Sequence, residues 1–234
     1  MQMHNLIFVA TALVMASIAG LAILWAQNNP VSDPDPERYA HQIAEFAKRD
    51  ELAFPRLDSI VFVGSSSIRR WDLVEQFPDL PTVNRGFGGS QISDVNHYID
   101  DVVLKYDPSI VVLYVGENDI SGRKSANQLL EGYRRFVKEV TEHSTETDII
   151  YLSIKPSPKR MASWSEMSAA NEKIRTFSAC YQDYHFVDVS KFMLNANGEP
   201  KPLLYVEDGI HMTAAGYDIW TSLLEPVLDM AREN

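Results

Sequence analysis

The chain has 234 residues, 45% of them hydrophobic and 23% charged, and these ordinary globular values exclude a wholly disordered protein. Its formal net charge is −11 and its Lys and Arg residues form no basic block, which excludes nucleic acid as an expected partner because such a surface repels phosphate. The single cysteine, Cys180, excludes an intrachain disulfide, and we expect it to be a small buried residue late in a helix.

The first predicted element is an apolar helix at the amino terminus. The run 6–26 carries no charge and is 21 residues long, close to the roughly 20 residues with which a helix crosses a bilayer. It exceeds the roughly 7–15 apolar residues of a typical signal peptide, and the segment Leu24-Trp25-Ala26 puts a large residue where signal cleavage needs a small one. We expect residues 1–27 to be a signal anchor, with a cleaved signal peptide and a buried core helix as alternatives. Either of the first two places the remaining chain outside the cytoplasm, in the periplasm or secreted, and an anchor ties it to the membrane.

A polar linker and then the folded domain follow. Residues 28–36 are polar and contain three prolines, which is typical of an extended linker before a domain over 37–234. Asp35 and Pro36 suit the cap and first turn of a helix that extends to about Ala53.

Helices and strands alternate along the rest of the chain. Short apolar runs predict five strands, at 59–64, 82–84, 109–115, 148–154 and 186–189. Helical spacing of apolar residues predicts five helices, at 66–74, 93–105, 125–142, 165–181 and 213–232. This alternation indicates crossover connections, a parallel sheet and a three-layer α/β/α sandwich.

Three motifs occur directly after the first three strands. They are Gly64-Ser65-Ser66-Ser67, the glycine-rich turn 84–90 and Gly116-Glu117-Asn118-Asp119. The carboxyl ends of parallel strands are where open α/β sheets bind ligands. Taken alone, each motif also fits an ordinary cap or turn.

A fourth motif, Asp208-Gly209-Ile210-His211, precedes the last helix. Its spacing can bring the carboxylate to the imidazole Nδ1 and leave Nε2 free to act as a base. A metal site is the main chemical alternative, but the other histidines show no ligand spacing.

Together, the four motifs in this order resemble those of the SGNH (GDSL-like) hydrolases over about residues 58–225. The resemblance places the four family residues at Ser66, Gly89, Asn118 and His211, with Asp208 as the third triad member. The run 61–66 looks closest to the branch with platelet-activating-factor acetylhydrolase-like proteins. Ser65 replaces the Asp usual in the first motif, and the family pattern favours Ser66 over its neighbours Ser65 and Ser67 as nucleophile.

The resemblance implies a flavodoxin-like sheet of order 2-1-3-4-5 and a serine esterase. Ser66, His211 and Asp208 would form the catalytic triad. The Ser66 and Gly89 N–H groups and the Asn118 side chain would form the oxyanion hole. The reaction would need neither a metal nor an organic cofactor.

The substrate is expected to be a small carboxylic ester with a short acyl group. Arg85, Phe87 and Trp164 are the candidate substrate-binding residues, although Arg85 also fits a structural ion pair. Alternatives on the same fold are a carbohydrate O-acetyl esterase, a lysophospholipase and a thioesterase. A non-catalytic binding module is disfavoured because every triad and oxyanion-hole position carries a competent residue. The oligomeric state is not predicted.

Overall fold

A computed structural model of the chain describes residues 31–233. The amino-terminal segment for which an apolar anchor or signal peptide is predicted lies outside these described residues. Among the helices within 31–233, none combines the length and the apolar character needed to cross a membrane.

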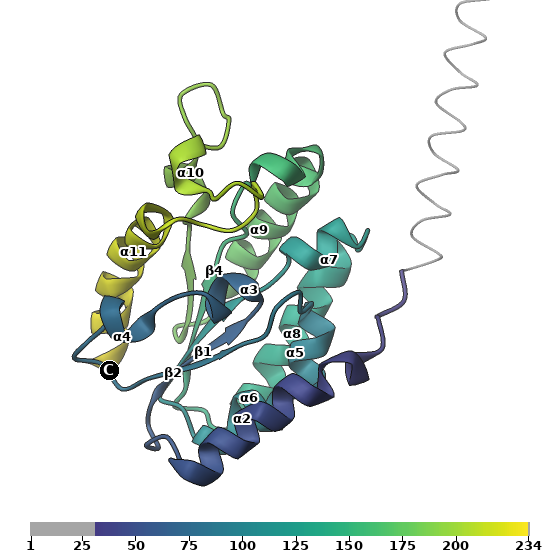
Figure 1. Ribbon diagram of the computed structural model, residues 1–234. Coiled ribbons are helices and arrows are strands. Elements are labelled where there is room, and N and C mark those ends of the chain that lie inside the picture. The colour runs from purple at the N-terminus through teal and green to yellow at the C-terminus, as the bar shows by residue number, and fades with distance from the viewer. Residues whose placement is uncertain (1–30, 234) are drawn as a thin grey trace, which may run out of the picture. The chain divides into compact units, whose positions relative to one another are not determined.

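Five parallel strands form a single sheet in the order β2-β1-β3-β4-β5 (Figure 1). The strands are β1 (Ile60–Gly64), β2 (Thr82–Gly86), β3 (Ile110–Tyr114), β4 (Asp148–Leu152) and β5 (Tyr184–Val187). The central strands β1, β3 and β4 are buried along their whole length, as continuous apolar runs are when both faces of a parallel sheet are covered. The α/β fold class and the strand order 2-1-3-4-5 are therefore confirmed.

Alternate residues of each strand point to opposite faces, and helices cover both (Figure 1). Val61 and Val63 belong to one buried cluster, whereas Ile60 and Phe62 belong to the other. The helices that contribute to the first cluster are α2 (Ala40–Leu52), α5 (Ile92–His97), α6 (Ile99–Val102), α7 (Glu117–Ser121), α8 (Ala126–His143) and α9 (Trp164–Ser178). Those that contribute to the second are α3 (Ser66–Arg69), α4 (Leu73–Gln76), α10 (Ser190–Met193) and α11 (Ala214–Arg232). The three-layer sandwich follows from this division.

Several helices begin where the sequence predicts a cap. Asp35 accepts a hydrogen bond from the Glu37 N–H at the start of the 3₁₀ helix η1 (Pro36–Tyr39), which leads into α2. The Ser125 hydroxyl accepts one from the Gln128 N–H, and the Gln128 side-chain oxygen accepts one from the Ser125 N–H. This reciprocal pair satisfies two of the N–H groups that a helix start leaves unpaired. Short 3₁₀ helices η2 (Leu104–Tyr106), η3 (Pro158–Ser163) and η4 (Pro202–Leu204) complete the chain.

Two predicted helices are interrupted. The helix predicted over 66–74 divides into α3 and α4 because Trp71 turns inward, with its ring 5.5 Å from that of Phe62, and Asp72 caps a new helix by accepting from the Glu75 N–H. The helix predicted over 93–105 divides into α5, α6 and η2. It breaks at Tyr98, whose backbone leaves the helical region and whose hydroxyl donates to the Pro36 carbonyl.

Two smaller predictions also need correction. The last strand begins at Tyr184 instead of Phe186, because its pairing with β4 starts two residues earlier. Cys180 is exposed instead of buried, since it lies beyond the end of α9 in the turn before β5.

Candidate active site

The first three motifs meet because the strands before them are neighbours. Gly64, the last residue of β1, pairs with Gly86 of β2 on one side and with Tyr114 of β3 on the other. The loops that leave these three positions therefore emerge at one edge of the sheet. The candidate site lies at this carboxyl edge, where open α/β sheets bind ligands.

Gly64 permits the sharp turn from β1 into α3. Its φ angle is +134°, and a Cβ atom at this position would lie 2.0 Å from the carbonyl oxygen of Tyr114. Any side chain would thus clash with the backbone of the neighbouring strand. The turn leaves Ser65 as the cap residue and makes Ser66 the first residue of α3.

Ser66, His211 and Asp208 are joined by two hydrogen bonds. Ser66 Oγ lies 2.9 Å from His211 Nε2, and His211 Nδ1 lies 2.6 Å from Asp208 Oδ2. The other carboxylate oxygen, Oδ1, accepts from the backbone N–H groups of Ile210 and His211, each at 2.8 Å. These two backbone bonds hold the carboxylate in the position from which its other oxygen bonds the imidazole.

The three adjacent serines differ in their surroundings. The Ser66 hydroxyl contacts His211, whereas Ser65 and Ser67 are buried at 4% and 3% exposure. The Ser65 N–H donates to the Tyr114 carbonyl, so this residue fastens the turn to β3. The geometry thus presents Ser66 to the imidazole.

The Asp208 carboxylate is held in its ionised form. Its hydrogen bonds with the His211 side chain and with the backbone N–H groups of His211 and Ile210 place the pKa of Asp208 well below its usual range. The side chain is 40% exposed, so hydrogen bonding and not burial determines this pKa. An ionised carboxylate at this position favours a proton on His211 Nδ1 and leaves Nε2 as the acceptor facing Ser66.

Gly89 and Asn118 are fixed to each other by the loops that carry them. The Asn118 amide nitrogen donates to the Ser90 carbonyl at 3.0 Å, next to Gly89. The buried Asp119 carboxylate accepts from the Ile92 N–H at the start of α5. Within residues 31–233, neither the Ser66 nor the Gly89 N–H has a hydrogen-bond acceptor, so both are free to donate to a ligand.

A buried charged cluster that the sequence does not reveal lies beside Asn118. Glu117 accepts from Lys155 Nζ at 2.6 Å and from the hydroxyls of Ser157 and Tyr114 at 2.8 and 3.1 Å. One terminal nitrogen of the Arg160 guanidinium, Nη1, lies 3.5 Å from the same carboxylate and 3.1 Å from Asn118 Oδ1. The only sequence signal is position, because Lys155, Ser157 and Arg160 follow the carboxyl end of β4.

The ionisation of this cluster reflects two opposing effects. Burial disfavours the Glu117 carboxylate, but the charges of Lys155 and Arg160 outweigh it and lower the pKa of Glu117 below its usual value. Burial lowers the pKa of the Lys155 ammonium below its usual value. The charge of Glu117 raises that pKa and so opposes part of the effect of burial. Each charge is therefore held in the interior by its partner.

Two of the three candidate substrate-binding residues lie in the core. The Arg85 guanidinium is buried and bonds Asp50 and the Tyr106 hydroxyl, which corrects the expected substrate contact in favour of the structural ion pair. Phe87 is fully buried with its ring edge-on to that of Tyr39, so it cannot line an open pocket. Trp164 is partly buried at the start of α9 and packs on the core cluster.

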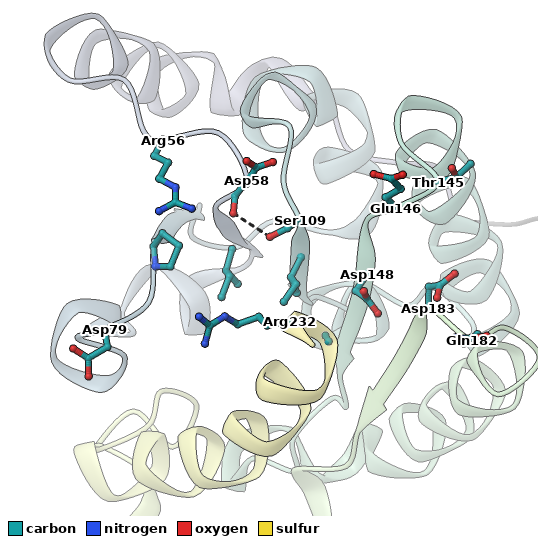
Figure 2. Close-up of a pocket in the computed structure, with 14 residues that line it drawn as sticks. Arg56, Asp58, Asp79, Ser109, Thr145, Glu146, Asp148, Gln182, Asp183 and Arg232 are labelled. Carbon is teal, nitrogen blue, oxygen red and sulfur yellow. Dashed lines mark hydrogen bonds between the residues drawn. The ribbon is translucent and has the colours of Figure 1, made fainter. Parts of the chain in front are cut away.

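A cavity of about 810 Å³ lies at the opposite end of the sheet (Figure 2). Its lining includes Ile60, Ile110 and Asp148, the first residues of β1, β3 and β4, so it opens at the amino ends of the strands. The Ser109 hydroxyl donates to the Asp58 carbonyl at its rim. This cavity is separate from the candidate active site. In the described part of the chain, no group of three or more His, Cys, Asp or Glu side chains is arranged to hold a metal ion.

The model of the GDSL-like Lipase/Acylhydrolase family matches residues 58–219, which contain all four motifs. No curated protein sequence matches the chain.

Solved structures share the fold. A Streptococcus pneumonia protein, provisionally named a platelet activating factor, aligns with TM-score 0.73 and 22% identity over 91% of this chain and 99% of its own. A GDSL-like lipase from Bacteroides thetaiotaomicron aligns with TM-score 0.68 and 21% identity over 84% and 98%. A carbohydrate esterase family 3 protein from Talaromyces cellulolyticus aligns with TM-score 0.62 and 18% identity over 76% and 100%.

Proposed function

Because the chain belongs to the GDSL-like lipase/acylhydrolase family and is a carboxylic ester hydrolase, we propose that it is a serine esterase with Ser66 as nucleophile, His211 as general base and Asp208 as the third triad residue. One observation carries this proposal. The hydroxyl, the imidazole and the carboxylate are linked in sequence by hydrogen bonds of 2.9 and 2.6 Å. That is the distance and order which proton transfer from a serine requires.

In the first half of the reaction, Ser66 Oγ attacks the ester carbonyl carbon while His211 Nε2 takes the hydroxyl proton. Asp208 stabilises the imidazolium that forms. The tetrahedral intermediate collapses, the bond to the alcohol oxygen breaks, and His211 returns its proton to the leaving alcohol. The acyl group remains on Ser66.

In the second half, water attacks the acyl-enzyme. His211 accepts a proton from that water, and the second tetrahedral intermediate releases the carboxylic acid as the proton returns to Ser66. The products are one alcohol and one acid, and the residues end in their starting protonation states.

The oxyanion of both intermediates is assigned to three donors. They are the backbone N–H groups of Ser66 and Gly89 and the Asn118 amide. The two N–H groups have no acceptor among residues 31–233, and Asn118 Nδ2 keeps one hydrogen after it bonds the Ser90 carbonyl. Loss of one such donor typically costs about 10²–10³ in rate.

We assign short-acyl esters as the preferred substrates, and a carbohydrate O-acetyl ester is the second candidate. The fold is shared with a carbohydrate esterase family 3 protein and with an acetyl-xylooligosaccharide esterase, which supports acetyl transfer to water as the reaction. A sugar ester and an aryl ester place the same acetyl group on Ser66 and differ only in the leaving alcohol.

The experiment is hydrolysis of p-nitrophenyl acetate, butyrate and octanoate by the full chain, beside Ser66→Ala and His211→Ala. We expect both variants to lose about 10³-fold or more in kcat while keeping the parent's circular dichroism spectrum. Activity should fall from acetate to octanoate. Acetylated xylan, assayed by acetate release, distinguishes the sugar ester from the aryl ester.

The variants Ser65→Ala and Ser67→Ala are the matched controls, because they remove a neighbouring hydroxyl that does not contact His211. Both should retain the parent's kcat. If Ser66→Ala keeps full activity and Ser65→Ala or Ser67→Ala loses it, the assigned nucleophile is wrong. If a folded parent hydrolyses none of the esters, the proposed esterase function fails.

A further inference from the structure

The Asn118 amide is held between two partners of opposite character. Its oxygen accepts from Arg160 Nη1 at 3.1 Å, and its nitrogen donates to the Ser90 carbonyl at 3.0 Å. Rotating the amide by 180° would set its NH₂ group against the guanidinium and its oxygen against a carbonyl oxygen. Two attractions would become two repulsions, so these contacts allow one orientation only.

Arg160 is in turn fixed by the buried carboxylate of Glu117. The same guanidinium nitrogen lies 3.5 Å from Glu117 Oε1, and the Arg160 side chain is 22% exposed. Glu117 cannot follow Arg160 outward because Lys155, Ser157 and Tyr114 also bond it. Arg160 therefore approaches Asn118 from a rigid, largely enclosed position.

The cluster also carries an excess of positive charge. Lys155 and Arg160 supply two cations, and Glu117 supplies one carboxylate. The partly enclosed Arg160 charge beside the amide is less screened than it would be in water, so it favours negative charge that develops in front of Asn118. This is a local exception in a chain of formal net charge −11.

The segment between β4 and α9 connects this cluster to the triad. The Lys159 N–H donates to the Gly209 carbonyl at 3.1 Å, inside the 208–211 motif. The Tyr205 hydroxyl, on the segment leading into the same motif, donates to the Pro156 carbonyl. One stretch of backbone thus supports both the carboxylate–imidazole motif and the Asn118 amide.

We propose that Arg160 is a positioning residue that acts through Asn118. It holds the amide with one N–H directed at the oxyanion and supplies the positive charge behind it. This inference rests on the proposed function, because it needs Asn118 to serve in the oxyanion hole. In the proposed reaction Arg160 touches no reacting atom. Its removal should therefore lower kcat and leave substrate binding almost unchanged.

The test compares three substitutions of Arg160 in the full chain, with p-nitrophenyl acetate as substrate. Arg160→Met removes both the donor and the charge, Arg160→Gln keeps an amide donor without the charge, and Arg160→Lys keeps the charge. We expect Arg160→Met to lower kcat about 10- to 100-fold with KM within about two-fold, below the cost of losing an oxyanion donor outright. Arg160→Gln and Arg160→Lys should each retain part of the kcat that Arg160→Met loses.

A double-mutant cycle with Asn118→Ala shows whether Arg160 acts through the amide. We expect Arg160→Met to lower kcat much less once Asn118 is alanine, because only the effect of its charge then remains. Lys159→Met is the matched control, since it removes a neighbouring exposed cation and leaves the Lys159 backbone bond in place. It should leave kcat unchanged. Circular dichroism and thermal unfolding confirm that each variant is folded.

Three results would overturn the inference. Multiplicative effects of Arg160→Met and Asn118→Ala would show that Arg160 acts independently of the amide. A raised KM with unchanged kcat would make Arg160 a substrate contact. An unchanged kcat in both Arg160→Met and Arg160→Gln would leave it no role in the reaction. Failure of the proposed function is a separate result, because Ser66→Ala would then retain the parent's activity.

Discussion

The ammonium of Lys155 lies 2.6 Å from the Glu117 carboxylate, and both side chains are almost completely withdrawn from solvent. Lys155 lies in the loop after β4, and Glu117 is the first residue of α7, which follows β3. A pair like this costs free energy to desolvate, and that cost is offset only while both partners are present. The stability of the protein should therefore be sensitive to substitution of either residue alone.

We predict that Lys155→Met lowers the free energy of unfolding by about 3–5 kcal/mol, because Glu117 is then left buried with a weaker set of partners. Adding Glu117→Gln should recover part of that loss, so that the double variant is more stable than the sum of the two single effects implies. Urea unfolding of the four proteins measures this coupling.

Lys138→Ala is the control for that prediction. Lys138 pairs with Glu142 on the outer face of α8, where both side chains are more than 60% exposed. Its removal should change stability by less than about 0.5 kcal/mol. Strictly additive effects of Lys155→Met and Glu117→Gln would contradict the coupling.

The second prediction concerns Asp208→Asn. The new amide oxygen can still accept from the Ile210 and His211 N–H groups, so the loop should keep its shape. The amide NH₂ would then face His211 Nδ1 and favour the tautomer with a proton on Nε2, which cannot accept the Ser66 proton. We expect kcat to fall by about 10²–10⁴-fold without loss of thermal stability, measured with p-nitrophenyl acetate. A fall in kcat that tracked a loss of folded protein would argue against this explanation.

The third prediction is the shape of the acid limb of the pH–rate profile. The pKa of Asp208 is lowered, so in the folded protein its carboxylate stays ionised above its ordinary pKa of about 3.9, and its charge is lost only as the pH falls through the lower folded-state value. The acid limb of log kcat/KM should therefore rise with a limiting slope of one and then level off, as expected for a single ionisation in the free enzyme. A slope of two would mean that a second group of the site, such as Asp208, titrates in the same range.

The sequence predicts the fold well because a parallel sheet leaves a strong pattern. Buried strands such as β3 (Ile110–Tyr114) are continuous apolar runs, and their alternation with amphipathic helices determines the fold class. The sequence is less informative about the ends of the short helices. Trp71 and Tyr98 fit a helical period locally, and their breaks depend on tertiary partners, Phe62 and Pro36, which no local pattern reveals.

The candidate site likewise contains some residues that the sequence predicts and others that it does not. Ser66, Asp208 and His211 lie in motifs with recognisable spacing, and the structure brings their side chains together. Arg160 and Lys155 lie in no such motif. Their part in the site depends on where the loop after β4 runs, and on a carboxylate, Glu117, at the start of α7. Arg85 shows the reverse, because it lies within the glycine-rich turn 84–90 and is a predicted substrate contact, whereas its partners are in the core.

The fourth prediction tests that assignment of Arg85. Arg85→Met leaves Asp50 paired with Lys105 and Tyr106, so we expect a loss of about 2–4 kcal/mol in unfolding free energy. In the protein that remains folded, KM for p-nitrophenyl esters should stay within about two-fold of the parent. A raised KM with unchanged stability would restore the substrate-binding role.

The fifth prediction concerns residues 6–26, which lie outside the described structure. Their uncharged run is long enough to cross a bilayer, so we propose a membrane-anchored protein with its esterase domain outside the cytoplasm. The parent should sediment with membranes and resist alkaline carbonate extraction. Leu13→Arg with Ile18→Arg should release it, because each arginine at mid-bilayer costs about 2.5–3.5 kcal/mol on the insertion scale. If the parent is instead soluble and its mass shows that the first residues have been removed, the segment is a cleaved signal peptide. A soluble parent of full mass would contradict both readings and leave the core helix.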